Sequence, residues 1–118
     1  MRTVSLKQNR AFRAVYGRGK SFANRLLVMY VLQGAPETNR LGVTVSRKVG
    51  GAVTRNRVRR LIKENFRQSE PDIVIGYDMV IVARAAAGRL KRAEAFGAVG
   101  AALRHLLTKH QLVSRNVP

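Results

Sequence analysis

The sequence predicts a small α+β domain, and three observations support that fold class. The chain has 118 residues, enough for one modest hydrophobic core but too few for two, so residues 1–118 are expected to form a single domain. Three segments repeat apolar residues at the spacing of an amphipathic helix. Other segments alternate apolar and polar residues or form short apolar runs, as strands do.

The first part of the chain predicts one helix followed by strands. A short helix is expected at residues 7–16, with Ser5 able to cap its start and Gly17 marking its end. Residues 21–34, SFANRLLVMYVLQG, are rich in Val, Leu, Tyr and Met and predict one long strand or two shorter ones. Residues 40–48, RLGVTVSRK, alternate large aliphatic with small or polar residues, which indicates a half-buried strand.

The second part predicts two longer helices separated by a strand. The first helix is expected at residues 51–68, and Pro71 and Gly76 mark the loop that follows it. Residues 77–84, YDMVIVAR, form a nearly continuous apolar run that is typical of an interior strand. Residues 92–110 repeat Ala, Phe, Val and Leu at helical spacing and predict a closing helix that covers the sheet. The predicted order is α, β, β, α, β, α. The first β segment in this order could be one strand or two.

The net charge points to a polyanionic partner. The chain carries 23 Lys and Arg against 6 Asp and Glu, a formal net charge of +17. Such a charge would repel itself in an isolated compact domain. Residues 1–67 hold 16 of these cations and 2 of the acids, so the binding surface is expected mainly in that part of the chain.

Other features exclude several classes of protein. No apolar run approaches the roughly 20 residues of a transmembrane helix, and residues 1–14 lack the apolar core of a signal peptide. A soluble, cytoplasmic protein is therefore expected, with no membrane partner and no small-molecule substrate. The absence of cysteine excludes disulfides, thiolate zinc sites and a cysteine nucleophile. The 6 acids are scattered along the sequence, so no catalytic or metal-binding site is expected in the protein alone.

The helix at residues 51–68 carries the densest positive charge. At about 100° per residue, one arc is predicted to pack against the sheet and consists of Thr54, Val58, Leu61, Ile62 and Asn65. The opposite arc holds Asn56, Arg59, Arg60, Lys63 and Arg67, with Arg55 and Arg57 at its borders. Charge alone leaves two interpretations open: a merely solvated face, or a face that binds phosphates and releases their counterions. The second is favoured because Glu64 is the only acid among these cations.

Residues 51–67, GAVTRNRVRRLIKENFR, resemble the RNR motif of the protein subunit of bacterial ribonuclease P. The preceding RLGVTVSRKVG, at residues 40–50, is similar to the strand and turn that come before the motif in that family. AFRAVYGRGKSFANRLLVMYVL, at residues 11–32, and YDMVIVAR, at residues 77–84, extend the resemblance over most of the chain in the same order.

The resemblance implies a fold, a function and a cofactor. The implied fold is a mixed four-stranded sheet with helices in the order αβββαβα, with a left-handed βαβ crossover around the RNR helix, as in a ribosomal-protein-like fold. In this family a catalytic RNA subunit removes the 5′ leader of precursor tRNA with Mg²⁺ ions, which the RNA and substrate mainly bind. The protein assists by binding the leader and by strengthening substrate and metal binding.

The resemblance also assigns two RNA-binding surfaces. Residues expected to contact the RNA subunit are Arg55, Asn56, Arg57, Arg59, Arg60, Lys63 and Arg67. A central cleft is expected to hold the single-stranded leader through Phe12, Tyr16, Ser21, Asn24, Arg25, Tyr30, Arg47 and Lys48. Aromatic faces beside cations suit unpaired nucleotides, although Phe12, Tyr16 and Tyr30 also fit a role in the core. Phe66, Tyr77 and Phe96 are expected in the core, and His105 and His110 at the surface or a helix end.

Two alternatives remain at this point. A ribosomal or ribosome-assembly protein would share the fold type and the positive charge. A sequence-specific DNA regulator would need a recognition helix preceded by another helix and a turn, whereas the basic helix here is preceded by a strand.

Overall fold

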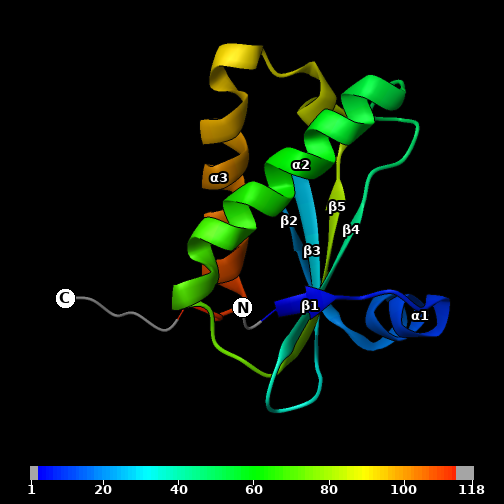
Figure 1. Ribbon diagram of the computed structural model, residues 1–118, viewed down its shortest axis with the longest axis vertical. Coiled ribbons are helices and arrows are strands. Elements are labelled where there is room, and N and C mark those ends of the chain that lie inside the picture. Colours follow the sequence, from blue (N-terminus) through cyan, green and yellow to red (C-terminus); the bar gives the residue numbers. More distant parts are fainter. Residues whose placement is uncertain (1–2, 114–118) are drawn as a thin grey trace.

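The computed structural model describes residues 3–113, which form one mixed β-sheet with helices on both faces (Figure 1). The strands are β1 (Thr3–Ser5), β2 (Lys20–Ala23), β3 (Leu27–Gln33), β4 (Asn39–Thr44) and β5 (Tyr77–Ala83). The helices are α1 (Asn9–Arg18), α2 (Ala52–Ser69) and α3 (Arg92–Lys109), with two short 3₁₀ turns, η1 (Glu70–Asp72) and η2 (Ala85–Arg89). The order of strands across the sheet is β1-β4-β5-β3-β2.

The predicted α+β class and mixed sheet are confirmed, but the predicted number of strands is wrong. The sheet has five strands rather than four, because Thr3–Ser5 pairs in parallel with β4 at one edge. Ser5 therefore belongs to a strand and does not cap α1, whose N-cap is Gln8. Strands β4 and β5 are parallel neighbours joined through α2, as expected for a βαβ unit, and the handedness of that crossover stays a prediction.

The segment predicted as one strand or two is a hairpin. Strands β2 and β3 pair antiparallel, with Lys20 opposite Val31 and Ala23 opposite Val28. Asn24 closes the turn because its Oδ1 accepts hydrogen bonds from the backbone N–H groups of Leu26 and Leu27, at 3.2 and 3.0 Å. This asparagine turn divides the segment without a glycine or proline.

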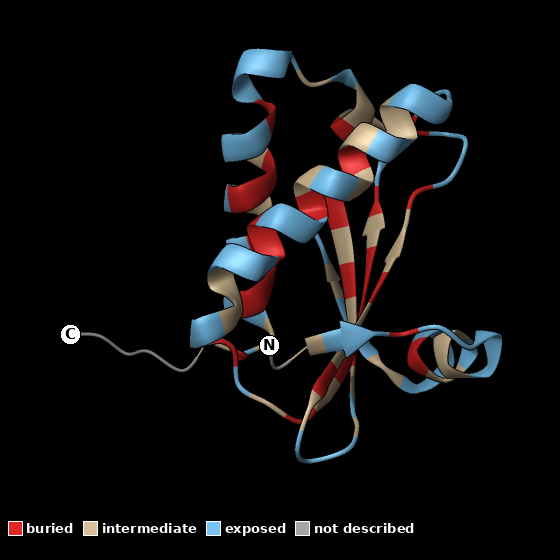
Figure 2. Ribbon diagram, in the orientation of Figure 1, coloured by how far each residue is buried: buried red, intermediate tan, exposed pale blue. Residues whose placement is uncertain are grey.

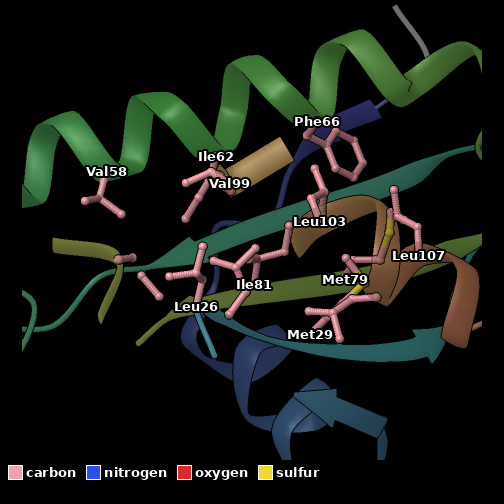
Figure 3. Close-up of a cluster of buried hydrophobic side chains, with 14 of the residues drawn as sticks. Leu26, Met29, Val58, Ile62, Phe66, Met79, Ile81, Val99, Leu103 and Leu107 are labelled. Atoms are coloured by element: carbon pink, nitrogen blue, oxygen red, sulfur yellow. The ribbon is translucent and has the colours of Figure 1, made fainter. Parts of the chain in front are cut away.

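The larger core lies between the sheet and helices α2 and α3. Helix α2 buries Val58, Ile62 and Phe66 at helical spacing, as its periodicity predicts. Figure 3 shows these side chains facing the sheet and α3, where Ile81 and Leu103 are also fully buried. The exposed surface of α2 points away from the sheet (Figure 2).

Replacing Ile62 with alanine tests this packing. Ile62 is fully buried in the larger core, so the substitution removes apolar contacts and leaves a cavity. We expect a loss of about 3 kcal/mol in the free energy of unfolding, measured by urea denaturation. Val53→Ala is the matched control, since Val53 lies on the same helix and is 82% exposed. Equal losses in the two variants would contradict the assigned orientation of α2.

A smaller core on the other face of the sheet holds α1. Val15 of α1 is fully buried and packs with Leu6 and Val80. Strand β4 lies between the two cores, and four of its six residues are half-buried, which agrees with the predicted half-buried strand. Gly42 is buried under α1, whereas Leu41 packs against the larger core.

Two details of the α2 and α3 contact complete the fold. Asn65 is buried, as predicted, and its Nδ2 donates hydrogen bonds to the carbonyl groups of Leu61 and Phe96. Gly100 permits this close approach, because a Cβ there would lie 2.5 Å from the Asn65 Oδ1. The prediction that Phe96 belongs to the core is wrong, since the residue is 39% exposed, whereas Phe66 is buried and Tyr77 packs partly against the core.

Candidate nucleic-acid interfaces

The basic face of α2 is held outward by the apolar residues that anchor the helix. Burial of Val58, Ile62 and Phe66 leaves the intervening positions pointing toward solvent. All seven residues predicted to contact the RNA subunit lie on this helix and are exposed or half-buried: Arg55, Asn56, Arg57, Arg59, Arg60, Lys63 and Arg67. We call this set the basic face.

The charges of the basic face are not neutralised within the described chain. None of its cations forms an ion pair with a carboxylate of residues 3–113, and neither does Glu64. Arg59 donates a hydrogen bond to the Asn56 Oδ1 at 3.0 Å, which positions the two side chains together. They line a shallow hollow of about 220 Å³ with Arg60, Lys63 and Glu64. Unpaired guanidinium groups beside a hollow are suited to phosphate oxygens.

Three aromatic rings lie together on the opposite side of the sheet. Phe12 and Tyr16 come from α1 and Tyr30 comes from β3, and we call these residues the aromatic patch. The ring centroids of Tyr16 and Tyr30 are 4.9 Å apart in an edge-to-face arrangement, and those of Phe12 and Tyr16 are 6.4 Å apart. The Tyr16 hydroxyl is 2.9 Å from the Thr44 Oγ1, within hydrogen-bond distance.

The aromatic patch combines packing with exposure. Phe12 and Tyr30 are half-buried against the smaller core, whereas Tyr16 is 38% exposed. The rings are therefore fixed on one side by the protein and open on the other. Such fixed, partly exposed rings can stack with unpaired bases at little cost in side-chain entropy.

Gly42 sets the position of Phe12. A Cβ at Gly42 would lie 2.5 Å from two carbon atoms of the Phe12 ring, so the ring occupies the space of the missing side chain. From the sequence, Gly42 was predicted only as part of a strand, and its contact with Phe12 was not predicted. The alternation in residues 40–48 already placed Gly42 and Thr44 on the same face of that strand.

The Gly42→Ala substitution should therefore displace Phe12 without deleting an aromatic ring. For the function that the resemblance implies, we expect about a tenfold weaker affinity for precursor tRNA in the assembled enzyme, which is about the effect of losing one stacked base. The affinity for the RNA subunit should not change. Gly17→Ala is the control, because no atom lies within 4 Å of a Cβ built there. Titrations of both partners distinguish these outcomes, and an unchanged precursor affinity would contradict the assigned role.

The polar residues predicted to lie beside the leader are not all on the face of the aromatic patch. Ser21 lies opposite Tyr30 in the β2 and β3 pairing, so it shares the face of the aromatic patch. Arg25 is exposed in the hairpin turn, and Arg47 and Lys48 are exposed in the turn between β4 and α2. The structure does not bring Asn24 to this face. Its Nδ2 lies 3.0 Å from the carbonyl oxygen of Ala102 and 3.1 Å from the His105 Nδ1, both on α3.

Arg40 and Asp78 form an ion pair on the α1 side of the sheet. Arg40 donates from Nε and Nη2 to the two carboxylate oxygens, at 2.9 and 2.6 Å. These hydrogen bonds raise the pKa of the Arg40 guanidinium further above its ordinary value. Because this cation is already neutralised, it adds little attraction for phosphate. The pairing was not predicted, since the two residues lie far apart in the sequence.

The described residues contain neither a metal cluster nor a membrane span. Nowhere between Thr3 and Val113 do three or more His, Asp or Glu side chains gather to hold a metal ion. No helix in that range is long and apolar enough to cross a membrane.

The fold and the two surfaces define a small, basic, RNA-binding α+β protein. Comparison with known proteins specifies the family, since residues 1–109 match the family model for ribonuclease P. The chain is 43% identical over 114 residues to the ribonuclease P protein component of Lachnoclostridium phytofermentans, covering 97% of this chain and 95% of that protein. It is 53% identical over 85 residues to the one from Clostridium botulinum strain Loch Maree, covering 71% and 77%.

A solved structure agrees with these relatives. The ribonuclease P protein from Staphylococcus aureus superposes with a TM-score of 0.79 at 30% identity, covering 100% of this chain and 97% of that one. The chain belongs to the ribonuclease P protein family. It is thus a subunit of the ribonucleoprotein endoribonuclease that processes the 5′ end of precursor tRNA. The alternatives of a ribosomal protein and a DNA regulator are set aside.

Proposed function

We propose that residues 1–118 act as one domain with two separate RNA-binding surfaces. The basic face of α2 binds the catalytic RNA subunit, and the aromatic patch binds the single-stranded leader of precursor tRNA. The observation that carries this proposal is that α1 and α2 pack on opposite faces of the sheet (Figure 1). One small domain can therefore contact two RNA molecules at once.

The basic face suits a folded RNA. Its side chains follow one side of a helix of 18 residues, a length of about 27 Å. Cations spaced along such a line can neutralise several phosphates of one RNA segment, which gives strong and salt-dependent binding. Asn56 adds an amide that can contact base edges or 2′-hydroxyl groups.

The aromatic patch suits an unpaired strand. Stacking on Phe12, Tyr16 and Tyr30 does not require one base sequence, because every base has an aromatic face. Ser21, Arg25, Arg47 and Lys48 provide donors for the sugar and phosphate groups of the same strand. Asn24 contributes indirectly, by holding the hairpin against α3. Leaders of many sequences can thus be bound by one surface.

We also propose that the protein strengthens binding of Mg²⁺ without supplying the main ligands. The ions are bound mainly by the RNA subunit and the substrate, in line with the chemistry of phosphate oxygens and hard cations. The protein contributes binding energy for the substrate, so that the RNA holds precursor tRNA and its metal ions at lower Mg²⁺ concentrations. The enzyme works in the cytoplasm.

Cleavage of precursor tRNA by a bacterial ribonuclease P RNA at low Mg²⁺ tests this function. We expect the protein to stimulate cleavage of precursors that have a leader, and to lower the Mg²⁺ concentration needed for half-maximal rate. Protein without RNA should give no cleavage. Stimulation that is independent of the leader, or no stimulation at any Mg²⁺ concentration, would contradict the proposal.

A further inference from the structure

A second group of cations surrounds an aromatic ring on the α3 side of the sheet. Lys20 and Phe22 lie on β2, and Lys109 and His110 lie at the end of α3. We call these four residues the Phe22 surface. It is distinct from both surfaces described above, because Phe22 packs against the larger core and not against α1.

The ring of Phe22 has unusually cationic surroundings. The Nζ atoms of Lys20 and Lys109 lie 5.2 and 5.1 Å from its centroid, and the ring of His110 lies 4.8 Å away in an edge-to-face arrangement. Both ammonium groups are exposed, and neither is paired with a carboxylate of residues 3–113. Two like charges are thus held at one ring without an anion between them.

The pKa of His110 is affected by the same positive environment. Its Nε2 donates a hydrogen bond to the carbonyl oxygen of Met29 at 2.9 Å. Burial lowers the pKa of His110, and the charge of Lys20 lowers it further, against the opposing effect of that hydrogen bond. The imidazole is therefore neutral at pH 7, and it leaves the two lysines as the charged groups that a ligand would meet.

The stability of the fold explains why a lysine stands at each of the two positions, but it does not explain why both ammonium groups lie beside the same ring. A lysine on an edge strand discourages pairing with another chain, and a lysine in the last turn of a helix interacts favourably with the helix dipole. Neither effect requires both ammonium groups to lie beside the ring of Phe22. A phosphate bound at this place could accept charge-assisted hydrogen bonds from both lysines.

The position of β2 connects this surface to the aromatic patch. Within residues 3–113, β2 is an edge strand of the sheet and pairs with β3. Adjacent residues of a strand point to opposite faces, so Ser21 shares the face of Tyr30 while Lys20 and Phe22 share the face of α3. A nucleic-acid strand that passes Ser21 can turn around this open edge and reach the lysines.

We propose that the Phe22 surface binds phosphates of the distal leader, beyond the nucleotides held at the aromatic patch. The inference rests on the proposed function, because the leader must first lie on the α1 side. Lys20 and Lys109 contact the phosphates, and Phe22 holds the two side chains in place. Long leaders thus gain affinity that short leaders lack.

The test compares precursor tRNAs whose leaders lengthen one nucleotide at a time, bound to the assembled enzyme. With the wild-type protein, affinity should rise over the nucleotides at the aromatic patch and rise again for longer leaders. The Lys20→Ala/Lys109→Ala variant should lose only the second rise, about tenfold for two exposed ion contacts. The slope of log affinity against log salt should fall by about 1.4 for long leaders.

A matched control removes the same charge elsewhere. Lys91→Ala/Arg92→Ala deletes two exposed cations at the start of α3 and should preserve both rises. Equal losses for short and long leaders, weaker binding of the RNA subunit, or no loss at all in the Lys20 and Lys109 variant would overturn the inference. If the first rise is absent in the wild type, the proposed leader surface itself is wrong, which separates the two failures.

Discussion

Replacing Phe12 and Tyr16 together with alanine will weaken binding of precursor tRNA by the assembled enzyme about 100-fold, since each stacked base contributes about 1–3 kcal/mol. Binding of mature tRNA, which has no leader, should be unchanged. The rings lie 6.4 Å apart on consecutive turns of α1 and face the same side. Affinities of the two tRNA forms, measured by filter binding or fluorescence, give the result directly.

Two controls separate stacking from folding in this experiment. Tyr16→Phe removes the hydroxyl that lies 2.9 Å from Thr44 but keeps the ring, so it should retain most of the affinity. Thermal unfolding must show that the double alanine variant is folded, because Phe12 also packs over Gly42. An equal loss for precursor and mature tRNA would show that the patch does not recognise the leader.

Replacing Arg60 and Lys63 with alanine will instead impair assembly with the RNA subunit. Both side chains are exposed on α2 and lack carboxylate partners within residues 3–113. Loss of two charge-assisted contacts of about 1.5 kcal/mol each predicts about a 100-fold weaker complex. The salt dependence should also become shallower, by about 1.8 in the log–log slope.

The specificity of that effect depends on a control with the same change in net charge. Lys91→Ala/Arg92→Ala lowers the charge equally, at the start of α3. If both double variants weaken binding of the RNA subunit to the same extent, general electrostatic attraction explains the result and the basic face has no special role. Once the RNA is saturated with the Arg60 and Lys63 variant, recognition of the leader should be intact.

Strong periodicity made α2 and β5 predictable from sequence. Val58, Ile62 and Asn65 fall on one arc, and the helix boundaries differ from the prediction by one residue at each end. The apolar run of β5 likewise predicted a central strand, which the sheet order confirms. In both segments the local pattern and the tertiary packing agree.

Segments whose structure depends on distant partners were predicted less well. Strand β1 has three residues and exists through its parallel pairing with β4, so its local sequence carries little signal. Helix α3 has small apolar residues on both sides, so the pattern did not distinguish the buried Ala95 from the exposed Phe96 beside it. The contact between Gly42 and the Phe12 ring was not predicted either, because it joins two residues that are far apart in the sequence.

Cross-linking of the leader tests the central claim of two separate surfaces most directly. A photoreactive nucleotide is placed at successive leader positions in precursor tRNA bound to the assembled enzyme, and the modified peptides are identified by mass spectrometry. The proposed arrangement predicts leader cross-links to α1 and β3, around Tyr16 and Tyr30, while photoreactive positions in the RNA subunit cross-link to α2. Leader cross-links concentrated on the basic face of α2 would contradict it.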